Sequence, residues 1–406
     1  MTYHARQRLL PTMPEFQRFN PTDCNFPRPR VPLLPTLHWR DLAFNNANTG
    51  NQSAMTGLSV RHFARGRYAM HAAYETAGVG SAGALLAPAY HCRTMLDPAL
   101  ALKGNILLYA LNSDLTPRME SIKILVENSQ PRVKALVVPH YFGFSQPAPL
   151  ITELAAFCSL HGITLIEDCS HAWQVVAERA SACQANSGHV LIGSPYKFFA
   201  CEDGGTLWGN PAEFSVAQPS APSLLGELKA LKQTLARSWR SHRASELVLP
   251  AEQIAMQNIH QGEHIRENSC SPSSMYDSRS ENNSGLALSR WVMRHTAVSR
   301  VVHQRQHNYR QWTRAVAGLR GAKALFTDLP PDCAPYMFAL HIAQPEQHFY
   351  QLKHLGVPIW RWDEMAVSDC PVATQYRSHL LHLPCHQSLT QEQMQWMTGA
   401  IMRVLA

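Results

Sequence analysis

A lysine and an aspartate, each close to the end of a short apolar run, are the residues of this sequence best placed to do chemistry. The run from His189 to Ile192 predicts a buried strand, and Gly193-Ser194-Pro195 ends it, so that Lys197 follows a strand end. A second run, Ile163-Thr-Leu-Ile-Glu-Asp168, carries apolar residues directly into two carboxylates. Ligands of parallel α/β sheets bind at the carboxyl ends of strands, where a buried carboxylate requires a cationic partner. We therefore expect Lys197 and Asp168 to share a ligand site.

Pyridoxal 5'-phosphate (PLP) is the cofactor that these residue types fit best. PLP needs a lysine for a Schiff base, a carboxylate that keeps its pyridine nitrogen protonated, and hydroxyls and backbone amides for its phosphate. Lys197 and Asp168 supply the first two groups. Ser194 and the turn that contains Gly66 and Arg67 supply the third, because a helix that begins after a glycine presents free N–H groups to an anion.

Three blocks of sequence extend this pattern and resemble the DegT/DnrJ/StrS sugar aminotransferases. The blocks are Glu167-Asp-Cys-Ser-His-Ala172, Ser194-Pro-Tyr-Lys197 followed by Asp203-Gly-Gly205, and His140-Tyr-Phe-Gly143. The resemblance covers most of residues 60 to 405. It implies the aspartate-aminotransferase (type I) fold, an α/β fold in which a mostly parallel, seven-stranded-type sheet lies between helices in a large domain. A small C-terminal α+β domain completes that fold.

The resemblance also implies roles for single residues. Lys197 resembles the lysine that binds PLP and moves the proton, and Asp168 resembles the partner of the pyridine nitrogen. His171 occupies the position beside the ring hydroxyl of the cofactor, and Tyr90 resembles the aromatic residue that stacks on the pyridine. The implied reaction moves an amino group from an amino acid, by analogy glutamate, to a keto-sugar. Because some relatives with histidine at the lysine position perform dehydration, Lys197 favours transamination.

Residues near the substrate follow from the same resemblance. His140 and Tyr141 would lie in a loop near the cofactor, and Arg361 would contact a carboxylate or phosphate of the substrate. The resemblance implies a homodimer whose active site is shared between subunits, with residues 271–284 as the region that crosses over. One departure is the position five residues before the lysine, where many relatives have serine and this chain has Ile192.

Two other interpretations remain open. Lys197 and Asp168 would also serve a type I PLP enzyme of another reaction class, such as a lyase or an acyl-transferring synthase. A non-catalytic, PLP-binding regulatory homologue is the third possibility, and an unusual basic segment at residues 212–270 favours it.

The elements that must position these residues alternate along the chain, which predicts a largely parallel sheet covered on both faces. We expect strands at 84–87, 106–109, 133–139, 163–168 and 190–193, and helices at 65–77, 94–102, 117–128 and 150–161. Gly78-Val-Gly80-Ser-Ala-Gly83 matches the dinucleotide fingerprint to the letter. That fingerprint must follow a strand and open a helix, whereas here a helix precedes it and a strand follows, so we discount it.

The predicted domains are an arm at 1–60, a large domain at 61–320 and a small domain at 321–406. The large domain includes a helical insertion at 212–270, with helices at 224–243 and 251–265, and a long helix that ends near residue 319. In the small domain we expect strands at 336–342 and 357–362 and helices at 345–355 and 390–405.

Composition is that of a globular protein with a sizeable core, since 45 % of the 406 residues are hydrophobic and 16 % are charged. The ten cysteines form no Cys-x-x-Cys pair, and we expect reduced thiols. The net charge of +7 is dispersed, which argues against a nucleic-acid partner. We find no apolar run long enough to span a membrane and no secretory signal, so we expect a cytoplasmic protein. His303 and His307 share a helical face, but no third ligand is evident and we predict no metal site.

Overall fold

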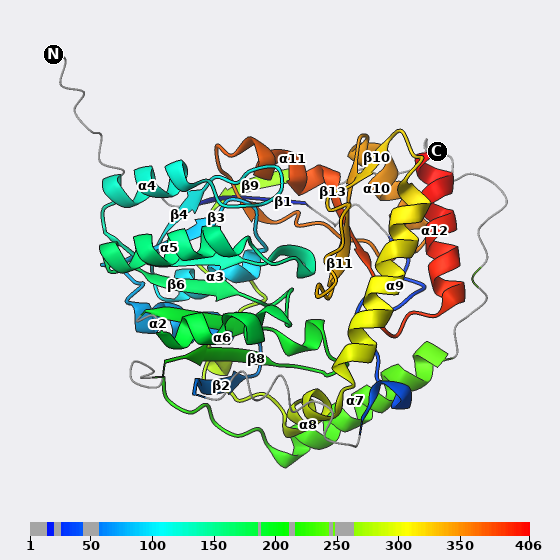
Figure 1. Cartoon of the computed structure of the whole chain (residues 1–406), viewed down its shortest axis with the longest axis horizontal. Helices are drawn as coiled ribbons and strands as arrows, with labels where there is room; N and C mark the ends of the chain where they lie inside the picture. The colour runs from blue at the N-terminus through cyan, green and yellow to red at the C-terminus, as the bar shows by residue number, and fades with distance from the viewer. Residues whose placement is uncertain are drawn as a thin grey trace.

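The computed structural model describes residues 14–19, 26–43, 57–185, 188–210, 216–242, 247 and 264–406. Its largest element is a seven-stranded sheet in the order β2-β8-β7-β6-β5-β3-β4 (Figure 1). The strands are β2 (Ser59–Phe63), β3 (Ala84–Pro88), β4 (Asn105–Tyr109), β5 (Val133–Pro139), β6 (Thr164–Asp168), β7 (His189–Gly193) and β8 (Gly205–Gly209). Strands β3 to β7 run parallel, and β8 is antiparallel to both of its neighbours. The predicted α/β class with a mostly parallel seven-stranded sheet is therefore confirmed.

Helices cover both faces of this sheet, and strand alternation decides which side chains each face receives. The helices are α2 (Gly66–Ala77), α3 (Arg93–Ala101), α4 (Met119–Asn128), α5 (Ala148–His161) and α6 (Val175–Ala185). Leu136 and Val138 of β5 belong to one core with α4 and α5, whereas Ala135 and Val137 belong to another with α2 and α3. This two-sided burial explains why β5 has an unbroken apolar sequence.

The five strands and four helices expected in the alternating region are all present, with ends within two residues of the prediction. Helix α6 and strands β2 and β8 were not predicted. Gly78 ends α2 in the left-handed conformation (φ 86°), and β3 begins six residues later. The glycine-rich segment therefore connects a helix to a strand, as its flanking sequence indicates.

The C-terminal region builds an antiparallel three-stranded sheet, β10 (Ala322–Ala324), β11 (Met337–Ile342) and β13 (Leu380–Pro384). Around it lie α9 (Val298–Val316), α10 (Pro345–His354), α11 (Pro371–His379) and α12 (Gln391–Leu405). Trp312, Phe338 and Met397 lie in its core. The strand expected at 357–362 is wrong: this segment makes a single bridge between Trp360 and His382, and Pro358 has no N–H for a ladder.

The long helix expected to reach residue 319 is also wrong, because two helices are present, α8 (Ala287–His295) and α9. The break falls where an N-terminal segment pairs with the chain. The N–H of Ala43 donates to the carbonyl of His295 (2.6 Å), and the N–H of Ala297 donates to the carbonyl of Asp41 (2.8 Å). Backbone groups that would continue the helix are thus used by a distant segment.

A second three-stranded sheet joins distant parts of the chain in the order β12-β1-β9. It consists of β1 (Glu15–Phe19), β9 (His264–Asn268) and β12 (Met365–Ala366). The helix predicted at 251–265 lies mostly outside the described residues, and its last residues, 264 and 265, belong to β9 instead. The helix predicted at 224–243 is present as α7 (Leu224–His242). The domain boundaries remain a prediction.

The nine described cysteines are all free thiols. None of the helices in the described ranges is long and apolar enough to cross a bilayer.

Candidate active site

Lys197 lies where the sequence predicts, four residues beyond the end of β7. The Gly193-Ser194-Pro195 break leads into a single 3-10 turn, η4 (Pro195–Lys197), which fixes the backbone of the lysine. Its Nζ lies 5.7 Å from the centre of the Tyr336 ring. Among the described residues this amine forms no hydrogen bond or ion pair, so it is available for covalent chemistry.

Arg305 of α9 holds the backbone of Lys197 in place. Its guanidinium is fully buried and donates to the carbonyls of Lys197 (3.1 Å), Phe198 (3.0 Å) and Pro335 (3.0 Å). A further bond reaches the side chain of Gln387 at 2.9 Å. Burial lowers the pKa of Arg305 to about 10, so the group is still a cation at neutral pH. No sequence motif indicates a role for Arg305.

Asp168 ends β6 next to the end of β7, since its Cα pairs with that of Ile192. Its side chain is buried and accepts one hydrogen bond, from the N–H of Ser170 (2.9 Å). None of the described cationic side chains forms an ion pair with it. A buried carboxylate with this little compensation is suited to a cation supplied by a ligand.

The predicted phosphate seat is a tight cradle at the start of α2. The hydroxyl of Ser194 donates to that of Ser170 (3.0 Å). A Cβ added to Gly66 would lie 2.0 Å from the Ser194 hydroxyl, and one added to Gly205 would lie 2.1 Å from the carbonyl oxygen of Arg65. A side chain at either position would clash, and the first turn of α2 adjoins the Ser194 hydroxyl. The Arg67 guanidinium, by contrast, donates to the carbonyl of Met275.

His171 lies beside this cradle and is held as a neutral ring. The N–H of Phe142 donates to its Nδ1 (3.3 Å), and its ring stacks on Tyr336 with centroids 4.5 Å apart. Burial, together with the positive charge of Lys197, holds the pKa of His171 well below its usual range. The proton of the neutral ring is then on Nε2, which can donate to a ligand oxygen.

Tyr90 and Tyr141 lie in an aromatic cluster where the edge of the seven-stranded sheet meets the β10-β11-β13 sheet. The Tyr141 hydroxyl donates to the carbonyl of Tyr90 (2.6 Å), and the Tyr90 hydroxyl shares a hydrogen bond with Nε2 of His382 (2.9 Å). Trp362 packs on Tyr90 with ring centroids 4.7 Å apart and lies 5.8 Å from His171. The cluster therefore lies next to His171, whose other ring neighbour, Tyr336, lies beside Lys197.

His140 has a different environment from the one its motif suggests. The N–H of Gln146 donates to its Nδ1 (2.9 Å), so its Nε2 carries the proton and donates to Glu167 (2.9 Å). His189 bonds the other oxygen of Glu167 at 2.7 Å, and Arg179 lies 3.5 Å away. Burial alone raises the pKa of Glu167, but the hydrogen bonds from both histidines outweigh it and hold that pKa well below its ordinary value. His140 thus belongs to a closed polar network.

Arg361 is likewise engaged within the C-terminal region. Its Nε pairs with Asp363 at 2.7 Å, and a second nitrogen donates to the carbonyl of Ser378 (3.2 Å). Its guanidinium also lies over the Phe349 ring, 3.9 Å from the centre. None of these contacts involves Lys197 or Asp168, and a role of Arg361 toward the substrate stays a prediction.

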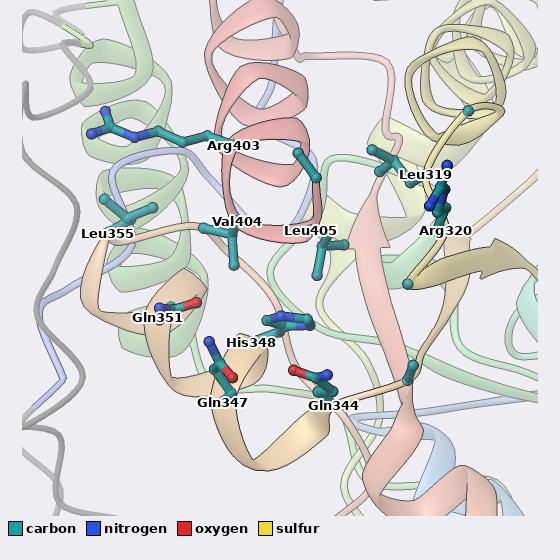
Figure 2. A pocket seen from close by; sticks show the side chains of 14 residues that line it. Leu319, Arg320, Gln344, Gln347, His348, Gln351, Leu355, Arg403, Val404 and Leu405 are labelled. Carbon is teal, nitrogen blue, oxygen red and sulfur yellow. The ribbon is translucent and has the colours of Figure 1, made fainter.

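A separate cavity of about 980 Å³ lies between the end of α9, α10 and α12 (Figure 2). Figure 2 shows His348 near its centre, with Gln344 and Gln347 below and Arg320 above. None of the predicted site residues lines this cavity.

The residues at the sheet edge fit PLP. Asp168 would meet the pyridine nitrogen, His171 the ring hydroxyl, and Ser194 with the first turn of α2 the phosphate, while Lys197 would be the point of covalent attachment. The fit depends on the cradle that Gly66 and Gly205 keep open and on the carboxylate of Asp168, which has no cationic partner among the described residues. Arg67 would have to leave the carbonyl of Met275 to reach the phosphate.

Residues 60–215 match the model of the DegT/DnrJ/EryC1/StrS aminotransferase family. The matched segment is less than half of the chain and contains Lys197, Asp168, His171, Ser194 and the α2 turn. Over this segment the predicted family is confirmed, and the predicted enzyme class and cofactor, a PLP-dependent aminotransferase, are those of this family. No curated protein matches the chain by sequence.

Solved structures share the fold over almost the whole chain. PseC of Helicobacter pylori, an aminotransferase involved in the biosynthesis of pseudoaminic acid, is 14 % identical with a TM-score of 0.60 and covers 94 % of this chain and 99 % of its own. The sugar aminotransferase CalS13 of Micromonospora echinospora is 15 % identical with a TM-score of 0.56, and the match covers 92 % of this chain and 99 % of that one. The aminotransferase TlmJ of Streptoalloteichus hindustanus is 16 % identical with a TM-score of 0.58, and the match covers 92 % of this chain and 98 % of that one. At these identities the likeness shows the fold, and the predicted type I fold is confirmed.

Proposed function

We propose that this chain is a PLP-dependent aminotransferase that moves an amino group from an amino acid, L-glutamate, to a keto-sugar carried on a nucleotide. Its place would be the biosynthesis of a surface polysaccharide or a related glycan. The observation that carries the proposal is that Lys197 and the buried Asp168 lie at neighbouring strand ends, where Asp168 accepts a single hydrogen bond and the lysine amine forms none among the described residues. By resemblance to the family, the enzyme would work as a cytoplasmic homodimer.

PLP, when bound, supplies the electron sink that makes the α-proton of an amino acid removable. Asp168 maintains that sink, because a buried carboxylate stabilises a protonated pyridine nitrogen. Lys197 is the group that holds the cofactor and, when released from it, moves the proton. Arg305 fixes the carbonyl of Lys197 and so limits where the amine can reach. His171 orients the ring through its Nε2 proton.

The acceptor side of the site is proposed to be the part of the aromatic cluster formed by Tyr141 and Trp362, next to Tyr90, which we expect to stack on the pyridine. Flat aromatic side chains with few polar groups are typical walls of pockets for ring-shaped ligands. The hydroxyls of Tyr90 and Tyr141 are bonded inside the cluster and both rings are buried, so the partly exposed Trp362 is the ring that the substrate would meet. This arrangement suits the apolar face of a sugar ring.

The test is an absorption spectrum of the purified protein, with and without added PLP and then glutamate. We expect a visible band that borohydride fixes to Lys197, a shift to shorter wavelength with glutamate, and release of 2-oxoglutarate. Lys197→Ala should bind PLP without forming the fixed adduct, whereas Lys229→Ala, at an exposed lysine of α7, should behave as the wild type.

Three results would each count against the proposal in a different way. A protein that stays colourless with PLP would exclude the PLP enzyme. A borohydride adduct on another lysine would remove Lys197 from the site. A PLP form that glutamate and other amino donors leave unchanged would favour another reaction class or the non-catalytic homologue.

A further inference from the structure

Helix α7 is attached to the protein through its polar side chains. The carboxylate of Glu227 accepts the N–H of Ala287 (2.6 Å) at the start of α8. Glu202, in the turn after Lys197, accepts a hydrogen bond from Thr234 (3.0 Å) and pairs with Arg237 at 2.7 Å. The inward face of α7 is therefore held by charge and hydrogen bonds, and its buried apolar residue is the small Ala230.

The outward face of α7 carries a row of leucines, which we call the leucine face. Its members are Leu224, Leu225, Leu228, Leu231 and Leu235, exposed by 84, 79, 63, 43 and 53 %. Leu224, Leu228, Leu231 and Leu235 follow one another at spacings of four, three and four residues, which places them along one side of the helix, with Leu225 at its edge. Trp39, 78 % exposed, lies in the N-terminal segment that α7 contacts, since the hydroxyl of Ser238 donates to the carbonyl of Leu37.

This arrangement is the reverse of an ordinary surface helix, which buries its apolar stripe and exposes its polar one. Single exposed leucines are common on proteins, but a continuous apolar row marks a surface that binds something apolar. Figure 1 shows α7 along the lower margin of the molecule, with the sheet and α8 on its inner side. In the described part of the chain, all five leucines keep at least 43 % of their surface exposed.

The charges beside the leucine face have one sign. Lys229 and Lys232 are exposed next to it, and the only carboxylate of α7, Glu227, is bonded to the start of α8. An apolar helix face flanked by lysines is the pattern of helices that lie in the interface of anionic membranes. A second copy of this chain is a poorer partner, because a two-fold contact through this face would bring lysines against lysines.

We propose that the leucine face is a docking site for the surface of an anionic lipid bilayer. The leucines would enter the boundary between headgroups and acyl chains, and Lys229 and Lys232 would contact the anionic headgroups. The proposal does not depend on PLP chemistry, because α7 contributes no residue to the Lys197 and Asp168 site. It would bring the aminotransferase to a membrane without a spanning segment.

The test is co-sedimentation of the full chain with vesicles of phosphatidylcholine alone or with about 30 % phosphatidylglycerol. We expect binding to the anionic vesicles that weakens when NaCl is raised to about 0.5 M. The triple variant Leu228→Gln/Leu231→Gln/Leu235→Gln should lose at least about tenfold in partition. Lys229→Glu/Lys232→Glu should remove the preference for anionic vesicles.

Two matched variants separate this effect from general surface changes. Leu160→Gln changes an 83 % exposed leucine on α5, and Lys323→Glu reverses an exposed lysine on β10. Both should bind vesicles as the wild type does. The same circular dichroism for all variants shows that folding is intact. The proposal is overturned if the wild type does not prefer anionic vesicles, or if the triple variant binds them equally well. It is also overturned if the wild type forms an oligomer that the triple variant cannot form while neither binds vesicles.

Discussion

At the scale of single residues, the site depends on two adjacent carboxylates, Glu167 and Asp168, that have opposite electrostatic environments. Successive side chains of β6 point to opposite faces of the sheet, so Glu167 and Asp168 have separate surroundings. Glu167 is neutralised by Arg179 and by hydrogen bonds from two histidines, and Asp168 receives one backbone N–H. The sequence places both at the ligand edge, but only Asp168 is left with charge for a ligand to meet.

We predict that Glu167→Gln lowers the free energy of unfolding by about 2–3 kcal/mol, because an amide cannot accept from both histidines and leaves Arg179 without its carboxylate. Urea denaturation of both proteins measures the change. Glu153→Gln on α5, which removes an exposed ion pair with Lys123, should cost less than about 1 kcal/mol. Equal losses for the two variants would show that the buried Glu167 network stabilises the fold no more than an exposed ion pair does.

The same variant should change how stability depends on pH. The pKa of Glu167 is lower in the folded protein than the ordinary value of about 4.3, so its stabilisation is complete above that pH and is lost as the pH falls through the lowered pKa. The gap in stability between wild type and Glu167→Gln should be constant from about pH 6 to 8 and narrow below about pH 4. A gap that widens on acidification would contradict this assignment.

At the scale of elements, the alternating strands and helices were predictable because each buries a face with its own period. Gly66, Asp168, His171, Ser194 and Lys197 could be predicted to meet because they follow the ends of those strands or open the first helix. The break between α8 and α9 could not be predicted, since residues 41–43 supply the bonds that stop the helix.

His140 and Arg361 illustrate the same limit, because their partners, Glu167 and Asp363, are set by local packing that the motifs do not encode.

Helix α9 supplies the clearest element-level prediction, because it delivers one buried cation to the turn that carries Lys197. Arg305→Met should remove donors from the carbonyls of Lys197, Phe198 and Pro335 and lower the free energy of unfolding by about 3–5 kcal/mol. It should also shift the pH at which the absorption of the PLP-bound protein titrates, since the amine is less well fixed.

Arg310→Met is the matched control, because it removes an exposed arginine from the same helix. It should leave both the urea midpoint and the titration unchanged. Loss of stability in Arg305→Met with an unmoved titration would mean that Arg305 is structural and does not position Lys197.

At the scale of the whole molecule, the N-terminal strand β1 joins segments that are far apart in sequence. It pairs with β9 and β12, and Phe16, its second residue, is fully buried. The guanidinium of Arg93, at the start of α3, lies over the Phe16 ring at 3.4 Å, and its Nε pairs with Asp97 at 2.9 Å. The large sheet, the C-terminal region and the N-terminus therefore meet around one aromatic side chain.

Phe16→Ala should lower the free energy of unfolding by about 3–5 kcal/mol, because it leaves a cavity in the core and uncovers the guanidinium of Arg93. Leu160→Ala, at an exposed leucine, should stay within about 0.5 kcal/mol of the wild type. Urea midpoints of the three proteins provide the comparison. If β1 were only an arm resting on the surface, the two variants would have the same midpoint. A large loss in Phe16→Ala alone would instead show that the N-terminal strand is part of the core that supports the site.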